Sequence, residues 1–223
     1  MASPFTAKTL AFLRALKRNN DREWFRSRKA DYEQHVRAPM LAVIERLADE
    51  FRTFAPEMVA DPRVNLYRIY RDTRFSEDKS PFKTNIGAYF PARGFPKGAG
   101  AGLYFHVGPA EVLIGGGLYM PASRDLLTLR EHIVADQRGF ERVLSARAFK
   151  DAVGGIQGQR LTRVPRGFAK DHPAAEHLKL KQFLGLRTFP AEFAVTPRFY
   201  PELVTIFRAI TPLVRFLNDG LRG

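Results

Sequence analysis

The sequence predicts an α+β fold in which a mostly antiparallel central sheet is covered by N-terminal and C-terminal helices. Helical spacing of apolar residues fills the first 54 residues, and short β-branched or aromatic segments divided by Gly and Pro fill residues 64–119. Helical spacing returns after Ser123. Helices on both sides of a group of strands are typical of one α+β domain. No repeat or linker divides the chain, so we expect a single domain over residues 1–223.

The N-terminal region predicts three helices. Ser3 followed by Pro4 has the form of an N-cap and a first helical residue, and this helix should end near Asn20. Asn20 is expected to cap the second helix, with Glu23 completing a capping box. The third helix should open at Pro39, because its apolar residues are spaced by four, three, four and three. These residues are Met40, Ile44, Leu47, Phe51 and Phe54.

The middle of the chain predicts four strands. They are short and rich in aromatic and β-branched residues. Their ranges are 64–70, 85–91, 101–107 and 111–119. The sequence Gly-Pro-Ala at 108–110 predicts a hairpin turn, which would make the last two strands antiparallel.

The C-terminal region predicts further helices around two more strands. Ser123 should cap a helix, and Pro212 should kink or divide the last helix. The remaining expected elements are a helix over 139–149, a strand over 160–166, a helix from Pro173, a strand over 186–194 and a final helix from Thr196-Pro197.

The composition narrows the class of protein. No run of eighteen apolar residues occurs, so we expect no membrane span, and the N-terminus lacks the pattern of a signal peptide. The absence of cysteine excludes a disulfide, a thiol nucleophile and a zinc–thiolate site. These observations favour a cytoplasmic protein.

The net charge of +13 favours negatively charged partners, such as nucleic acid or phosphorylated small molecules. The basic residues are spread evenly, with 19 Lys or Arg in residues 1–112 and 17 in residues 113–223. The charge alone therefore marks no particular segment as a nucleic-acid site.

The stretch RIYRDTRFSEDKSPFKTNIG, residues 68–87, is the first candidate site. Four cations in its loop could hold phosphate or carboxylate oxygens. They are Arg71, Arg74, Lys79 and Lys83. Asp72 and Asp78 would orient these cations, could bind Mg²⁺ beside a phosphate, and are weak catalytic candidates. The alternative is a structural ion-pair network, with Arg71–Asp78 or Asp72–Lys79 pairs that pin the loop to the sheet.

A glycine-rich strand is the second candidate. Gly115, Gly116 and Gly117 would let a ligand approach bare backbone, and Tyr119 could donate a hydrogen bond to it. The alternative is close packing of other parts of the protein over the glycines. The segment matches neither the Walker loop nor the dinucleotide-binding fingerprint.

The histidines give one further catalytic candidate. His106 alternates with apolar neighbours in a strand and is the best-placed general base, although a structural role is the alternative. His172 and His177 are five residues apart, which puts them on different faces of a helix, so we expect no metal site. No serine nucleophile elbow is present.

Four motifs together give the chain a family resemblance. NNDREWF, RIYRDTRFSEDKSPFKTNIG, GGGLYMP and RVPRGFAKDHPAAEHLKLKQF resemble the family of domain of unknown function 2461, over roughly Phe5 to Phe216. The resemblance implies one domain and supplies no activity, cofactor or ligand. Phe82 stands where many relatives have Tyr, so a phenol hydroxyl cannot contact a ligand there.

Three hypotheses for function follow. The first is binding, with or without turnover, of a small phosphorylated or carboxylated ligand between loop 71–83 and strand 115–119. The second is nucleic-acid binding by a wider basic face that adds Arg22, Arg26, Arg28 and Lys29. The third is a structural or protein-interaction module in which the charged loop is architecture.

Overall fold

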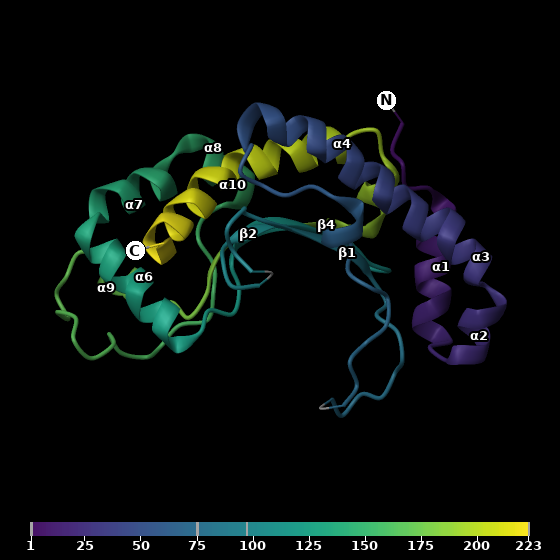
Figure 1. The fold of residues 1–223 in the computed structure, drawn as a ribbon, viewed down its shortest axis with the longest axis horizontal. Helices are drawn as coiled ribbons and strands as arrows, with labels where there is room; N and C mark the ends of the chain where they lie inside the picture. Colours follow the sequence, from purple (N-terminus) through teal and green to yellow (C-terminus); the bar gives the residue numbers. More distant parts are fainter. Residues whose placement is uncertain (1, 75, 97, 223) are drawn as a thin grey trace. The chain divides into compact units, whose positions relative to one another are not determined.

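The computed structural model describes residues 2–74, 76–96 and 98–222. It confirms the α+β fold: four antiparallel strands form one sheet in the order β1-β2-β3-β4, and helices precede and follow them along the chain (Figure 1). The strands are β1 Ile86–Pro91, β2 Gly102–Val107, β3 Glu111–Leu118 and β4 Phe183–Pro190. The first three lie within a few residues of the predicted ranges.

Contacts along the chain define two compact units, which we describe separately. The first unit comprises Met1–Phe90, Tyr104–Ile114 and Thr188–Val204, and the second comprises Pro91–Leu103, Gly115–Arg187 and Thr205–Gly223. A single domain over residues 1–223 stays a prediction.

The first unit contains the N-terminal helices. They are α1 Ala7–Arg18, α2 Arg22–Ser27, α3 Lys29–Tyr32, one π-helical turn η1 Glu33–Arg37, α4 Ala38–Phe54 and α5 Pro62–Asn65, with a 3-10 helix η2 Ala191–Val195. The predicted apolar period of α4 is confirmed, since Met40, Ile44, Leu47 and Phe51 are buried. The Phe51 ring meets the Phe90 ring of β1 edge to face at 5.2 Å. This helix thus covers one face of the sheet within the first unit (Figure 1).

Both N-caps predicted for the N-terminal helices are wrong. Thr6 caps α1, and Ser3 instead donates a hydrogen bond to the Ala194 carbonyl at 2.6 Å. Asp21 caps α2, because its carboxylate accepts the Trp24 backbone N–H at 2.8 Å. Asp21 lies one residue nearer to α2 than Asn20, and its carboxylate oxygen accepts an N–H group that is free at the start of the helix. The Asn20 side chain is then available for a distant partner.

The predicted strand over residues 64–70 is also wrong. Asp61 accepts the Arg63 backbone N–H and Pro62 opens the short helix α5, which takes up the start of that range. The rest pairs only through isolated antiparallel bridges, Leu66 with Ala88 and Tyr70 with Phe82.

The second unit contains the later helices. They are α6 Ser123–Ala135, α7 Gln137–Ser145, α8 Arg147–Val153, α9 Ala175–Leu178 and the greater part of α10 Phe199–Arg222. Ser123 is the first residue of α6 and Ala122 its cap. The predicted strand 160–166 is reduced to one isolated bridge between Arg160 and Leu180, and the predicted strand 186–194 begins earlier, as β4.

Pro212 lies inside α10 and does not divide it. Proline leaves a backbone carbonyl of the preceding turn without its usual donor. The neighbouring Thr211 hydroxyl donates to the Phe207 carbonyl at 2.7 Å, which adds a side-chain bond to this part of the helix.

The described residues contain no candidate for a membrane-spanning helix or for a metal site. No helix there is both long and apolar enough to cross a membrane. No group of three or more His, Asp or Glu side chains there has the arrangement of a metal site.

Candidate anion-binding site at the charged hairpin

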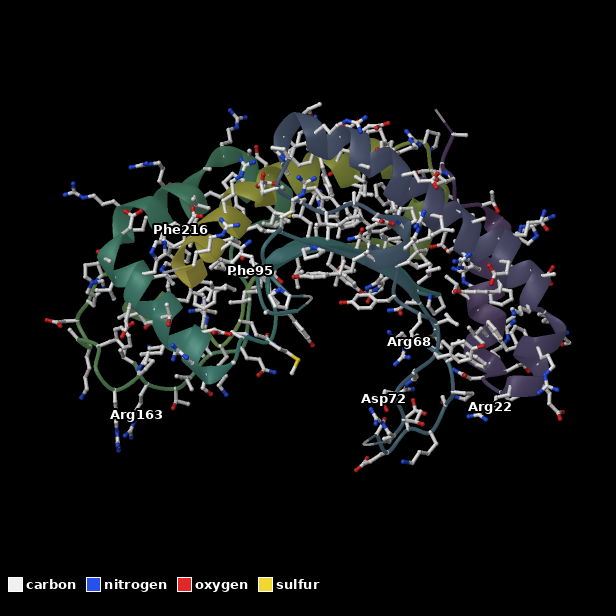
Figure 2. All side chains as sticks on the ribbon, in the orientation of Figure 1. Arg22, Arg68, Asp72, Phe95, Arg163 and Phe216 are labelled. Carbon is white, nitrogen blue, oxygen red and sulfur yellow. The ribbon has the colours of Figure 1, made fainter. Side chains whose placement is uncertain are left out.

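Residues 66–88 form a long, irregular hairpin in the first unit. The Tyr67 N–H donates to the Gly87 carbonyl at 3.0 Å, and the Lys83 N–H donates to the Ile69 carbonyl at 2.7 Å. The hairpin extends away from the sheet on the side opposite α4 (Figure 1). Figure 2 shows Arg68 and Asp72 on this hairpin, with Asp72 closer to its tip.

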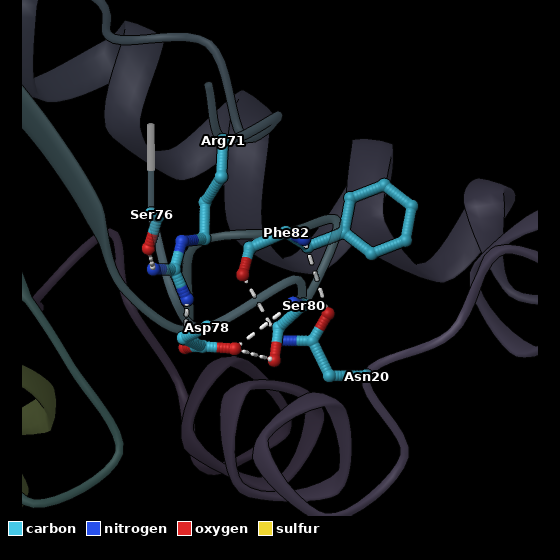
Figure 3. A network of polar contacts seen from close by, with 6 residues as sticks. All are labelled: Asn20, Arg71, Ser76, Asp78, Ser80 and Phe82. Atoms are coloured by element: carbon cyan, nitrogen blue, oxygen red, sulfur yellow. Dashed lines mark hydrogen bonds and ion pairs between the residues drawn. The ribbon is translucent and has the colours of Figure 1, made fainter. Parts of the chain in front are cut away.

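Asn20 and Phe25 hold the returning arm of the hairpin. The Asn20 amide donates to the Phe82 carbonyl at 2.9 Å and accepts the Phe82 N–H at 3.1 Å (Figure 3). The Phe25 ring of α2 stacks on the Phe82 ring with centroids 4.2 Å apart. Phe82 is therefore a packing residue.

Arg71 lies in a network at the tip of the hairpin. Its guanidinium pairs with Asp78 and donates to the Ser76 hydroxyl at 3.3 Å (Figure 3). Asp78 also accepts the Ser80 backbone N–H at 2.9 Å and the Ser80 hydroxyl at 2.6 Å. These Ser80 hydrogen bonds, followed by the contact with Arg71, hold the pKa of Asp78 well below its usual range.

The remaining tip cations also have partners. Arg74 pairs with Asp72 at 2.7 Å, and its hydrogen bonds lower the pKa of Asp72 to about 2. Lys79 donates to the Thr73 carbonyl at 3.0 Å, so it is not the partner of Asp72. The Lys83 ammonium lies 4.9 Å from the centre of the Tyr67 ring, in a cation–π contact. The four cations named from the sequence thus occur on one hairpin, each with an internal contact.

A cavity of about 270 Å³ lies at the base of the hairpin. Its walls come from α3, η1 and residues 62–70. The lining residues are Tyr32, Glu33, Arg37, Pro62, Arg63, Leu66, Tyr67, Arg68, Ile69 and Tyr70. Three guanidinium groups and one carboxylate give this lining a net charge of +2. The sequence did not predict this site, because the two segments that line the cavity lie about thirty residues apart in the chain. In addition, Arg68 was assigned to a predicted strand and not to a site.

Only part of that positive charge is neutralised. Arg37 pairs with Glu33 at 3.2 Å. The side chains of Arg63 and Arg68 make no hydrogen bond or ion pair with any residue that the structure describes. Burial raises the pKa of Tyr32 to about 12, so its phenol stays protonated at the cavity wall.

The glycine segment belongs to the second unit. A Cβ on Gly116 would lie 2.8 Å from the Gly102 carbonyl oxygen, and one on Gly117, whose φ is +125°, would collide with the Phe183 carbonyl. Gly115 is similarly close to Gly185. Tyr119 follows the strand with 64% of its surface exposed. The close approach of neighbouring strands accounts for these glycines within their own unit, and a ligand on them stays a prediction.

His106 lies in the first unit on β2. Its Nδ1 atom is 3.1 Å from the Tyr104 hydroxyl oxygen, and its Nε2 atom is 3.6 Å from a Glu111 carboxylate oxygen. The other two catalytic candidates, Asp72 and Asp78, are exposed side chains held by cations of the hairpin.

The comparisons with known proteins give one match. The model of the family described as "Conserved hypothetical protein (DUF2461)" matches residues 8–216. A search of curated proteins found no match. A search of solved structures found none either.

Proposed function

We propose that this chain, which belongs to the DUF2461 family of conserved hypothetical proteins, binds a small phosphorylated or carboxylated ligand in the cavity at the base of its charged hairpin. One observation carries the proposal: Arg63 and Arg68 line that cavity, and their side chains make no ion pair or hydrogen bond with any described residue. A guanidinium group presents paired N–H donors that match the oxygens of a phosphate or a carboxylate.

The dimensions of the cavity favour a small ligand. Drug-sized ligands and cofactors occupy clefts of roughly 300–1,000 Å³. At about 270 Å³ the cavity lies just below that range. It suits a phosphate ester or a short carboxylic acid, and it is too small for a dinucleotide.

The tip and the base of the hairpin then have different roles. Arg71 and Arg74 are engaged by Asp78 and Asp72, so an incoming anion would have to displace those carboxylates. Among the described residues no carboxylate forms an ion pair with Arg68, and Asp72 acts on it only at longer range. The anion therefore binds at the base, and the tip cations add to the positive potential around it. A contact of the ligand with Gly115, Gly116 or Gly117 stays a prediction.

Calorimetric titration tests this function. Inorganic pyrophosphate and citrate serve as probes of the two oxyanion classes. We expect saturable binding of at least one probe, and a loss of about tenfold in affinity for Arg68→Ala, which corresponds to one charge-assisted hydrogen bond. Arg22→Ala is the matched control, because Arg22 is an exposed arginine of the same unit that does not line the cavity. Equal affinity in wild type and Arg68→Ala would refute the site.

A structural or interaction role of the hairpin tip is the second candidate, and the ion pairs favour it. Each tip cation already contacts a carboxylate, a carbonyl or a ring. If this role is the only one, Arg71→Ala lowers the melting temperature while neither probe binds to the wild type.

A further inference from the structure

A second cluster of polar side chains crosses the sheet of the first unit. Tyr104 and His106 are two residues apart on β2, so their side chains lie on the same face. Glu111 begins β3 after the turn in which the Gly108 N–H donates to the Glu111 carbonyl at 2.8 Å. The Tyr67 ring meets the Tyr104 ring at 6.2 Å between centroids. These four side chains therefore form one continuous group.

The contacts of His106 fix the direction of its hydrogen bonds. A carboxylate only accepts, so Glu111 favours the tautomer that carries the proton on Nε2. Nδ1 is then an acceptor, and the Tyr104 hydroxyl 3.1 Å away donates to it. Burial lowers the pKa of His106 below its usual value, and Glu111 opposes this effect in part. Because the pKa is lowered, the ring is neutral at neutral pH.

Gly87 provides the space for this arrangement. A Cβ at position 87 would lie 3.0 Å from the Tyr104 hydroxyl oxygen and 3.1 Å from the His106 Cβ. Its backbone has no positive φ that would itself demand glycine. Glycine at position 87 therefore leaves the space that the Tyr104 and His106 side chains occupy.

We propose that Tyr104, His106 and Glu111 form a proton-transfer site in which the Tyr104 hydroxyl oxygen is the reactive atom. When the Tyr104 oxygen attacks the carbonyl carbon of an activated acyl group, the new C–O bond replaces the bond to the leaving group, which departs with its electron pair. The Tyr104 proton moves to His106 Nδ1. The resulting imidazolium is stabilised by the Glu111 carboxylate, as in other base–acid pairs of this kind. Tyr104, as the attacking group, and His106, as the base that takes its proton, are the catalytic residues, and Glu111 is a positioning residue.

The surroundings indicate the class of substrate. The Lys83 ammonium lies against the Tyr67 ring, beside Tyr104, and brings a positive charge to the cluster. A substrate whose oxygen gains negative charge during the reaction, such as a carbonyl compound or an activated acyl group, fits this charge. The site adjoins the cavity at the base of the hairpin through Tyr67, which lines that cavity and meets the Tyr104 ring. The cavity lining itself includes neither Tyr104 nor His106.

Chemical acetylation of the intact protein tests the site without its natural substrate. N-acetylimidazole transfers its acetyl group to a tyrosine oxygen and releases imidazole, while the phenol proton passes to a base. Peptide mass spectrometry then gives the rate at each tyrosine. We expect Tyr104 to react at least about tenfold faster than Tyr119 and Tyr70, although these are 64% and 55% exposed.

Three variants identify the relay. His106→Gln and Glu111→Gln should reduce the Tyr104 rate by about tenfold and leave the Tyr119 rate unchanged. Glu45→Gln is the matched control, since Glu45 is an exposed carboxylate of α4 in the same unit. Long-range proton–nitrogen spectra should show His106 protonated on Nε2 in the wild type and a mixture of tautomers in Glu111→Gln. The Tyr104 rate is the readout that a merely structural contact between Glu111 and His106 would not change.

The proposal fails if Tyr104 reacts no faster than Tyr119 in the wild type. It also fails if Glu111→Gln, a substitution at a half-exposed side chain, leaves both the Tyr104 rate and the His106 tautomer unchanged.

Discussion

Asn65 is fully buried, and its side chain joins the segment before α5 to strand β1 in the first unit. Its amide nitrogen donates to the carbonyls of Val59 and Tyr89 at 2.9 and 2.6 Å, and its oxygen accepts the Asp61 N–H at 2.5 Å. Asn65→Leu keeps the volume and leaves these groups without partners. We expect a loss of about 3 kcal/mol in the free energy of unfolding, measured by urea denaturation. A loss below about 1 kcal/mol would show that water or another side chain replaces the amide.

The ion pairs of the hairpin tip should contribute unequally to stability. Arg74 and Asp72 are exposed, and such pairs are screened by solvent and salt. Arg74→Ala should therefore leave the melting temperature unchanged. The Arg71 side chain is only 27% exposed and has two partners, so Arg71→Ala should lower the melting temperature by about 2 °C. Differential scanning calorimetry of both variants measures this contrast, and equal shifts would contradict it.

At the scale of elements, the latch between Asn20 and the hairpin should position the arm that carries Lys83. Asn20→Ala removes two hydrogen bonds to the Phe82 backbone. We expect a loss of about 1–2 kcal/mol in the free energy of unfolding. Asn19→Ala is the control, because the exposed Asn19 side chain donates only to the Ala15 carbonyl of its own helix. Similar losses in both variants would mean that the helix end, and not the latch, is affected.

The elements differ in how far the sequence predicts them. Strands β1 to β3 and the apolar stripe of α4 follow from local periodicity, and they are confirmed. The first residues of helices are harder to predict, because neighbouring residues can each act as the N-cap. Asp21 caps α2, whereas Asn20 bonds to the distant Phe82, a contact that the local sequence does not reveal. The arm over residues 64–70 has strand-forming residues, but Asp61 and Pro62 begin a helix there.

The candidate sites show the same limit. The four hairpin cations could be assigned to one loop because they are close together in the sequence. His106 could be singled out because it alternates with apolar residues in a predicted strand. It does not reveal the cavity, whose walls join η1 to residues 62–70, or the contact of His106 with Tyr104 and Glu111. Those depend on the register of hairpins and on helix packing, which tertiary structure decides.

At the scale of the whole molecule, buried histidines should make stability depend on pH. Burial lowers the pKa of His106 and of His177 below the usual value of 6.5. The unfolded chain then binds more protons than the folded chain at mildly acidic pH. Stability is fully present above about pH 6.5 and decreases as the pH falls below it. The melting temperature should be lower at pH 5 than at pH 7.5.

His177→Gln gives the control for this dependence. In the wild type, the His177 ring lies against Phe140 at 5.3 Å, and its buried Nδ1 has no hydrogen-bond partner among the described residues. The variant should show a smaller decrease in melting temperature between pH 7.5 and pH 5. An unchanged decrease would assign the effect to other groups.

The location of the bound anion tests the central claim most directly. Titration of the protein with inorganic pyrophosphate, followed through the side-chain Nε–H signals of arginine by NMR, reports on each guanidinium separately. If the cavity at the base of the hairpin is the site, the signals of Arg63 and Arg68 shift and saturate together, while those of Arg71, Arg74 and Arg22 stay in place. Shifts confined to Arg71 and Arg74, or no saturable shift at any arginine, would contradict the account.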